Sequence, residues 1–184
     1  MFVELINRDI DAVALHNDLS KLLADHDLYY QNQISITSVM GGDDWTCSIG
    51  RNNLKFKERY YSTINKSLEN TYMHSIIERY PQYYRWRVLK LLPKTTYSVH
   101  DDFNGVDDNL RLHVPITTNQ DSFLCFFAGM PSSGSEVKVA YEHLELGKSY
   151  EVNTTGLHTA VNYGTTDRYH LVGIRYENRD HRTH

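Results

Sequence analysis

The second half of the chain is a series of short β-prone segments, and this pattern limits the fold more than any other feature. Eight runs rich in β-branched and aromatic residues follow one another, each bounded by Gly, Asn, Asp or Pro. They span residues 86–92, 96–102, 109–117, 123–128, 137–144, 148–152, 157–162 and 168–176. Strands in this number without intervening helices are typical of a sandwich or jelly roll, and they argue against a parallel sheet of alternating strands and helices. The sequence therefore predicts a mainly β fold.

The first 85 residues have a different character, because their apolar residues recur at helical spacing. Residues 7–25 predict an amphipathic helix with Asn7 or Asp9 as its N-cap, and residues 54–80 predict the longest helix, which Pro81 ends. A short strand at residues 34–39 and a loop at residues 40–53 lie between them. We expect the helices to pack outside the β layer. Residues 1–184 would then form a single domain, with residues 1–85 as a helical support region and residues 86–176 as the jelly-roll core.

The composition is that of a globular protein and excludes several classes. The net charge of -4 and the pI near 6.2 give no basic surface for nucleic acid. The N-terminal residues lack the pattern of a secretion signal, and no stretch approaches the roughly 18 apolar residues of a membrane span. Cys47 and Cys125 form no paired motif, which fits a reducing compartment. We therefore expect a cytoplasmic protein that binds neither nucleic acid nor membranes.

One predicted strand carries a histidine and a carboxylate at strand spacing. His100 and Asp102 are two residues apart, and side chains two apart on a strand project from the same face. His158, on a later strand, would complete two imidazoles and one carboxylate, the ligand set of non-haem Fe(II) sites that leave one side of the ion open. The alternative is a chance pair with Asp102 as an ordinary turn residue. Asp101 is a second candidate carboxylate, although on a strand its side chain would project from the face opposite to that of His100.

Two arginines on predicted strands extend this candidate site. Arg111 and His113 share one face of the strand at 109–117, whose other face is apolar. Arg168 opens the last strand, ten residues after His158. An arginine beside a metal is suited to bind a carboxylate through two parallel hydrogen bonds, and a salt bridge at a strand end is the structural alternative.

The joint order of these residues resembles the aspartyl/asparaginyl β-hydroxylase-like family of Fe(II)- and 2-oxoglutarate-dependent oxygenases. The matching residues are His100, Arg111, His113, the turn Gly147-Lys148-Ser149-Tyr150, His158, Asn162 and Arg168. They lie between residues 86 and 176, and the leading segment does not identify the family. Members named for aspartyl hydroxylation have Gly where this chain has Asp102. Small amino-acid hydroxylases of the same group, such as the proline 3-hydroxylase type, keep a carboxylate, and this chain is similar to them at that position.

The resemblance implies a double-stranded β-helix, a cupin-like jelly roll, with iron bound near its open end. His100 and His158 would be iron ligands together with Asp102. Arg168 would hold the distal carboxylate of 2-oxoglutarate, His113 would contact this co-substrate near the metal, and Ser98 is a further candidate for it. Such an enzyme uses Fe(II), 2-oxoglutarate and O2 to hydroxylate a C–H bond, and it releases succinate and CO2.

The length of the chain is the only feature of the sequence that narrows the class of substrate. A short chain without an accessory domain favours a free amino acid or a peptide with an Asp, Asn or Pro-type side chain, and Arg111 is the candidate for its carboxylate. The alternative function is a non-redox cupin-like protein that binds a metal or a small ligand. A structural interaction domain with three incidental ligands is a third interpretation. Turnover of 2-oxoglutarate distinguishes the oxygenase from the non-redox cupin-like protein and from the structural domain.

Overall fold

A computed structural model describes residues 2–50, 54–102, 107–128 and 137–178. Its largest element is a six-stranded antiparallel sheet with the strand order β1-β10-β7-β12-β5-β2. In that order the strands are β1 (Val3–Asn7), β10 (Ser149–Asn153), β7 (Asp107–Thr117), β12 (Arg168–Asn178), β5 (Tyr84–Leu91) and β2 (Gln33–Ser35).

A smaller sheet has four antiparallel strands in the order β6-β11-β8-β9. These are β6 (Thr95–Thr96), β11 (His158–Asn162), β8 (Ser122–Ala128) and β9 (Lys138–Glu142). A separate pair joins β3 (Thr37–Ser38) to β4 (Thr63–Ile64). Seven of the eight predicted strands are therefore present, and the run at residues 96–102 is regular only at its start. Beyond β6 it keeps a single bridge to β11, at His100.

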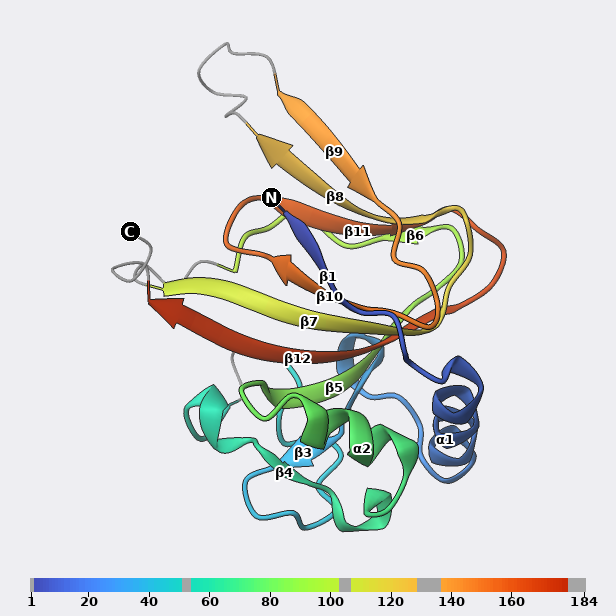
Figure 1. Ribbon diagram of the computed structural model, residues 1–184, viewed down its shortest axis with the longest axis vertical. Coiled ribbons are helices and arrows are strands. Elements are labelled where there is room, and N and C mark those ends of the chain that lie inside the picture. The colour runs from blue at the N-terminus through green and yellow to red at the C-terminus, as the bar shows by residue number, and fades with distance from the viewer. Residues whose placement is uncertain (1, 51–53, 103–106, 129–136, 179–184) are drawn as a thin grey trace.

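The two larger sheets face each other, and the helices lie on the outer side of the six-stranded sheet (Figure 1). The layers are thus helices with the β3–β4 pair, then the six-stranded sheet, then the four-stranded sheet. This arrangement is a double-stranded β-helix, the cupin-like jelly roll, with helices packed outside, as predicted from the sequence. The strands that carry the candidate site residues come from both facing sheets.

The first predicted helix is present but begins later than expected. α1 (Ala12–Asp25) starts after Asp11, whose carboxylate accepts hydrogen bonds from the N–H groups of Val13 and Ala14 at 3.0 and 2.9 Å. Asn7 and Asp9 are therefore not the N-cap. The residues before the cap form β1, and β2 follows α1 in the sequence. The region expected to be a helical support thus also supplies two strands to the large sheet.

The long helix predicted for residues 54–80 is wrong. Only α2 (Tyr72–Arg79) is α-helical, and the residues before it form β4 and two 3₁₀ turns, Glu58–Tyr60 and Lys66–Leu68; a third such turn is Tyr30–Asn32. Asn70 has a left-handed backbone conformation with φ 63°, which interrupts a right-handed helix. Thr71 then caps α2 by accepting a hydrogen bond from the His74 N–H at 3.2 Å. The buried residues Tyr61, Ile64 and Leu68 are three and four positions apart, so these turns and β4 reproduce the apolar spacing of a helix.

Two apolar cores hold the layers together. The first lies between the helices and the large sheet and includes Leu15, Met73 and the fully buried Trp86. The second lies between the two sheets around Phe126 of β8. Gly173 of β12 is required by the first core, because a Cβ atom there would lie 2.7 Å from Cε2 of Trp86.

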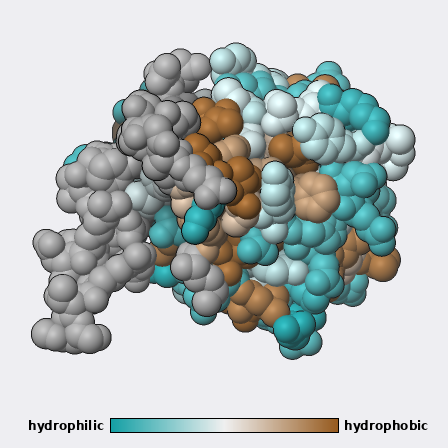
Figure 2. All heavy atoms as spheres, turned by 90° about the horizontal axis from the view of Figure 1, so that it is seen from above, coloured by the Kyte–Doolittle hydropathy of each residue, from teal (hydrophilic) through white to brown (hydrophobic). Residues whose placement is uncertain are grey.

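The surface seen from above in Figure 2 is mixed, with apolar side chains gathered near its centre and hydrophilic ones around them. Exposed apolar residues include Phe2 beside β1 and Val139 and Tyr141 on β9. Trp45, predicted to lie in a loop, is buried in the first core against His26. Within the described residues, no helix has the length and apolar character needed to cross a membrane.

Candidate metal centre

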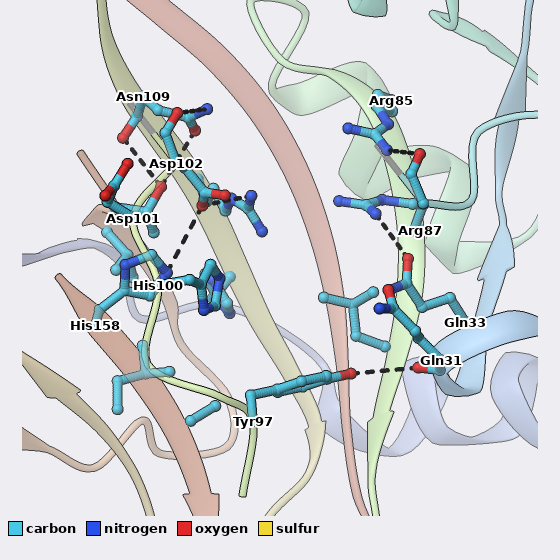
Figure 3. Close-up of a pocket in the computed structure, with 18 of the residues that line it drawn as sticks. Gln31, Gln33, Arg85, Arg87, Tyr97, His100, Asp101, Asp102, Asn109 and His158 are labelled. Carbon is cyan, nitrogen blue, oxygen red and sulfur yellow. Dashed lines mark hydrogen bonds and ion pairs between the residues drawn. The ribbon is translucent and has the colours of Figure 1, made fainter. Parts of the chain in front are cut away.

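A cavity of about 620 Å³ lies between the two facing sheets. Strands β5, β7, β10 and β12 of the large sheet contribute to its lining, as do β8 and β11 of the small one. Figure 3 shows His100, Asp102 and His158 on one side and Arg85 and Arg87 on the other. Every site residue expected from the sequence lines this cavity: Ser98, His100, Asp102, Arg111, His113, His158 and Arg168.

The two candidate histidine ligands lie directly opposite each other. The His100 N–H donates to the His158 carbonyl at 3.0 Å, and the His158 N–H donates to the His100 carbonyl at 2.8 Å. Residues opposed in this way project their side chains from the same face. The two imidazole ring centres are accordingly 4.4 Å apart.

Asp102 joins this pair from the same segment. Its backbone N–H donates to the carbonyl of Thr154, the residue after β10, at 3.0 Å. Its Oδ2 lies 3.7 Å from His158 Nε2. One potential ligand atom from each of the three residues lies within 4.8 Å of the others. Asp101, the other candidate carboxylate, is exposed at the cavity edge and is not part of this group.

Backbone carbonyls fix the tautomer of both histidines. His100 Nδ1 lies 2.8 Å from the Ser98 carbonyl, and His158 Nδ1 lies 2.9 Å from the Gly156 carbonyl. Because a carbonyl oxygen only accepts, each Nδ1 carries the proton, and in the neutral ring Nε2 keeps its lone pair. Metal-binding histidines are typically oriented in this way.

Local charges favour the ligand form of Asp102, and burial favours that of His158. Burial raises the pKa of the Asp102 carboxyl, but the positive charge of Arg111 and the nearby His158 lower it by more than burial raises it. The pKa of Asp102 therefore lies below its usual value. Burial also lowers the pKa of His158, despite the opposing effects of the Gly156 carbonyl and Asp102. A neutral imidazole and an ionised carboxylate are the forms that bind a metal ion.

These residues fit a divalent transition metal. Two imidazole nitrogens and one carboxylate oxygen, held near one another and open to a cavity, are the donor set typical of non-haem Fe(II) sites. His158 and Asp102 are only 6% and 8% exposed, so the surrounding structure, rather than solvent, fixes their positions.

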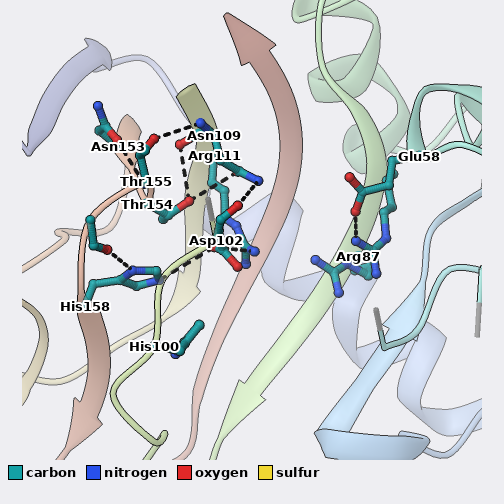
Figure 4. Close-up of polar contacts among 12 residues, drawn as sticks. Glu58, Arg87, His100, Asp102, Asn109, Arg111, Asn153, Thr154, Thr155 and His158 are labelled. Atoms are coloured by element: carbon teal, nitrogen blue, oxygen red, sulfur yellow. Dashed lines mark hydrogen bonds and ion pairs between the residues drawn. The ribbon is translucent and has the colours of Figure 1, made fainter. Parts of the chain in front are cut away.

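A polar network supports Asp102 from behind (Figure 4). Arg111 Nη2 lies 2.5 Å from Asp102 Oδ2. Asn109 Nδ2 donates to the Asp102 carbonyl at 3.4 Å, and the Thr154 hydroxyl donates to Asn109 Oδ1 at 3.2 Å. Arg111, expected from the sequence to bind substrate, therefore pairs with the candidate metal ligand in this structure.

Of the remaining expected site residues, Arg168 and His113 are buried in the cavity wall, whereas Ser98 is exposed. Arg168 is 4% exposed, and burial lowers the pKa of its guanidinium to about 10 despite the opposing effect of Tyr97. His113 Nδ1 lies 3.2 Å from Nδ1 of His170. Burial and the charges of Arg168 and Arg111 keep the pKa of His113 well below its usual value, so this histidine is neutral. Ser98 is exposed and offers its carbonyl to His100.

Solved structures share this architecture. The non-haem α-ketoglutarate-dependent carbocyclase SnoK from nogalamycin biosynthesis aligns with a TM-score of 0.58 and 10% identity, covering 95% of this chain and 80% of that one. HygX from Streptomyces hygroscopicus, with nickel and 2-oxoglutarate bound, has a TM-score of 0.56, 8% identity and coverages of 96% and 83%. A Pseudomonas putida prolyl-4-hydroxylase has a TM-score of 0.55, 9% identity and coverages of 96% and 92%.

The chain has the fold of non-haem 2-oxoglutarate-dependent oxygenases. α-Ketoglutarate and 2-oxoglutarate are the same molecule. No model of a known protein family matches the sequence, and no curated protein has a matching sequence. The fold is therefore established by structural likeness, at identities too low to carry over an activity.

Two cavity residues of this oxygenase fold were missed from the sequence. Arg85 and Arg87 lie on β5 and line the cavity across from the candidate metal centre. Arg87 alternates with the buried Trp86 and Val88, and this alternation assigns it to the inner face of the sheet. The alternation of charged and apolar residues in Tyr84–Leu91 was the available signal, because arginine is rarely buried without a ligand or partner.

Proposed function

We propose that this chain is an Fe(II)- and 2-oxoglutarate-dependent oxygenase. The observation that carries the proposal is the convergence of His100, Asp102 and His158 in the cavity of an oxygenase fold, with both Nδ1 atoms bound to backbone carbonyls. This arrangement leaves two Nε2 atoms and one carboxylate for a metal ion. With 2-oxoglutarate and O2, such an iron centre oxidises a C–H bond of the substrate and yields succinate and CO2.

Arg168 is the proposed partner of the distal carboxylate of 2-oxoglutarate. Its guanidinium is buried in the cavity wall, and its Nε has no hydrogen-bond partner among the described residues. No described carboxylate pairs with it either. An arginine remains charged in a protein, so a carboxylate that binds there removes the cost of an uncompensated buried charge.

His113 and Arg111 have supporting roles in this proposal. His113 lies on β7, two residues after Arg111, and Arg168 opens the neighbouring strand β12. Because His113 is neutral, it offers a polar contact to the co-substrate without adding charge. Arg111 orients the Asp102 carboxylate and holds it ionised. A direct contact of Arg111 with substrate stays a prediction from the sequence.

The finer family assignment and the substrate belong to the same proposal. The order of site residues supports the aspartyl/asparaginyl β-hydroxylase-like group, and retention of Asp102 supports its small amino-acid hydroxylase branch. The substrate class we propose is accordingly an amino acid or a short peptide, hydroxylated at a C–H bond.

Anaerobic calorimetry tests the proposal directly. Wild-type protein loaded with Fe(II) should bind 2-oxoglutarate, and binding should require the metal. His100→Ala should lose metal and 2-oxoglutarate binding together, whereas Arg168→Gln should keep the metal and lose 2-oxoglutarate. His16→Ala, which removes an exposed histidine of α1, is the matched control. Metal binding without any 2-oxoglutarate binding would favour the non-redox cupin-like alternative.

A further inference from the structure

Arg85 lies in the cavity wall across from the candidate metal centre, and each of its three guanidinium nitrogens has a partner. Nε donates to the Ser48 carbonyl at 3.0 Å, Nη2 donates to the Gly50 carbonyl at 2.9 Å, and Nη1 pairs with Glu58. Its backbone adopts φ 53°, a left-handed conformation that its contacts maintain. Arg85 therefore has a structural role, fastening the segment around Gly50 to the large sheet.

Arg87, two residues further along the same strand, is bound very differently. It is 4% exposed, and Nη1 donates to a neutral acceptor, Gln33 Oε1, at 2.7 Å. Its Nε is buried without a partner, and no carboxylate in the described part of the chain forms an ion pair with it. A guanidinium has five N–H donors and stays protonated. Among the described residues, most of the donors of Arg87 therefore have no partner, and its charge has no directly bound counter-ion.

The charge balance of the cavity points the same way. Four arginines line it against three carboxylates, Glu58, Asp101 and Asp102. A divalent metal ion and the dianion of 2-oxoglutarate cancel each other, so they leave this positive excess in place. Arg87 on β5 is exposed to this excess, because the like charges of Arg85 and Arg111 act on it more strongly than the opposite charges of Glu58 and Asp102.

Arg87 is distinct from the arginine assigned to 2-oxoglutarate. In the sheet register Arg168 pairs with Leu91, and Arg87 pairs with Val172, four residues further along β12. The two backbone positions are thus roughly 13 Å apart along the strands. Tyr97 lies between the two walls, and its hydroxyl donates to the Gln31 carbonyl at 3.3 Å (Figure 3).

We infer that Arg87 forms a second anion subsite, which binds a carboxylate of the primary substrate and positions that substrate across the cavity from the metal. The inference rests on the proposed oxygenase function, because it takes the metal and Arg168 as the site of the co-substrate. It restricts the substrate class to molecules with a free carboxylate, such as an amino acid or a peptide with an acidic side chain or a C-terminal carboxylate near the reacting carbon.

Acetate and acetamide are suitable probes, because they have nearly the same size and differ in charge. Protein loaded with Zn(II), which is diamagnetic, and saturating 2-oxoglutarate is titrated with each probe by ligand-observed NMR. Wild type should bind acetate more tightly than acetamide. Arg87→Gln should weaken acetate binding at least about tenfold, the loss of a charge-assisted hydrogen bond, and should retain 2-oxoglutarate. Arg8→Gln, at an exposed arginine, is the control and should change neither affinity.

A second variant keeps the inference testable if Arg87→Gln does not fold. Because Gln33 Oε1 already contacts Arg87, the Gln33→Glu carboxylate would neutralise the guanidinium from within the protein. This variant should melt at a higher temperature than wild type and lose the preference for acetate. Undiminished acetate binding in Gln33→Glu would overturn the inference.

Three further outcomes decide the remaining alternatives. Equal binding of acetate and acetamide by wild type would overturn the subsite, and so would loss of 2-oxoglutarate binding in Arg87→Gln, which would make Arg87 the co-substrate anchor. Failure of wild type to bind 2-oxoglutarate would instead refute the proposed oxygenase. In that case the same titration with Zn(II) alone still tests the subsite, because binding of acetate that depends on Arg87 supports it and binding that does not depend on Arg87 overturns it.

Discussion

His100 and His158 exchange both of their backbone hydrogen bonds, at 3.0 and 2.8 Å, although they are far apart in the sequence. This one antiparallel bridge aligns two imidazoles on the cavity face and sets Asp102, two residues on, beside them. The candidate metal centre is therefore a product of strand register. A slip of one residue would turn His158 to the opposite face and dismantle the site.

Removal of the Arg111 guanidinium should weaken metal binding without unfolding the protein. Arg111 pairs with Asp102 at 2.5 Å and is itself not a candidate ligand. Loss of a partner that orients a ligand typically costs roughly 10- to 100-fold in metal affinity. Titration of Arg111→Gln with Zn(II), compared with Arg8→Gln, measures the effect. An unchanged Zn(II) affinity would show that Asp102 is held without Arg111.

The stability of the metal-free protein should fall as the pH is lowered below about 6.5, the ordinary pKa of histidine. Burial, followed by neighbouring positive charges, keeps the pKa values of His113 and His170 well below that value. In this window the unfolded chain binds protons that the folded chain does not, so each histidine costs up to about 1.4 kcal/mol of stability per pH unit.

Urea unfolding of wild type at pH 7 and pH 5.5 checks this expectation. His170→Phe removes one of the two buried groups without altering the cavity lining, so the difference between the two pH values should become smaller. The same pH dependence in both proteins would mean that the buried pair does not control it.

Gly173→Ala should destabilise the protein by about 1–3 kcal/mol, the usual cost of overpacking a core. The added Cβ would lie 2.7 Å from the ring of Trp86, which is fully buried and has no room to move away. Gly42→Ala is the control, because no heavy atom lies within 4 Å of the Cβ position and the change should stay within about 0.5 kcal/mol. Equal unfolding free energies for the two variants would refute this account of the core.

Local periodicity was sufficient to predict the β-rich half of the chain and the shared face of His100 and Asp102. The two-residue spacing of His100 and Asp102 and the alternation around Arg111 and His113 survive in the structure, because a half-buried strand forces alternate side chains to opposite faces. That His158 lies opposite His100 depends on register between distant strands, and only the order of residues resembling a known family indicated it.

The N-terminal half was less predictable, for physical reasons that particular residues show. The apolar spacing in residues 54–80 resembles a helix, yet Asn70 at φ 63° and the pairing of β4 with β3 break it. β1 is short, and its strand conformation depends on pairing with β10, which no local pattern encodes. Arg87 was not identified from the sequence, because its alternation with apolar residues does not by itself show that its side of the strand is buried.

Formation of succinate from 2-oxoglutarate is the most direct test of the central claim. Purified protein with Fe(II) and ascorbate in air should produce succinate even without added substrate, because oxygenases of this kind decarboxylate 2-oxoglutarate slowly on their own. His100→Ala and Arg168→Ala should each reduce that rate at least tenfold, since one removes a proposed iron ligand and the other the proposed carboxylate partner. Wild-type protein that forms no succinate, or forms it at the same rate as both variants, would contradict the assignment of this cavity as an oxygenase site.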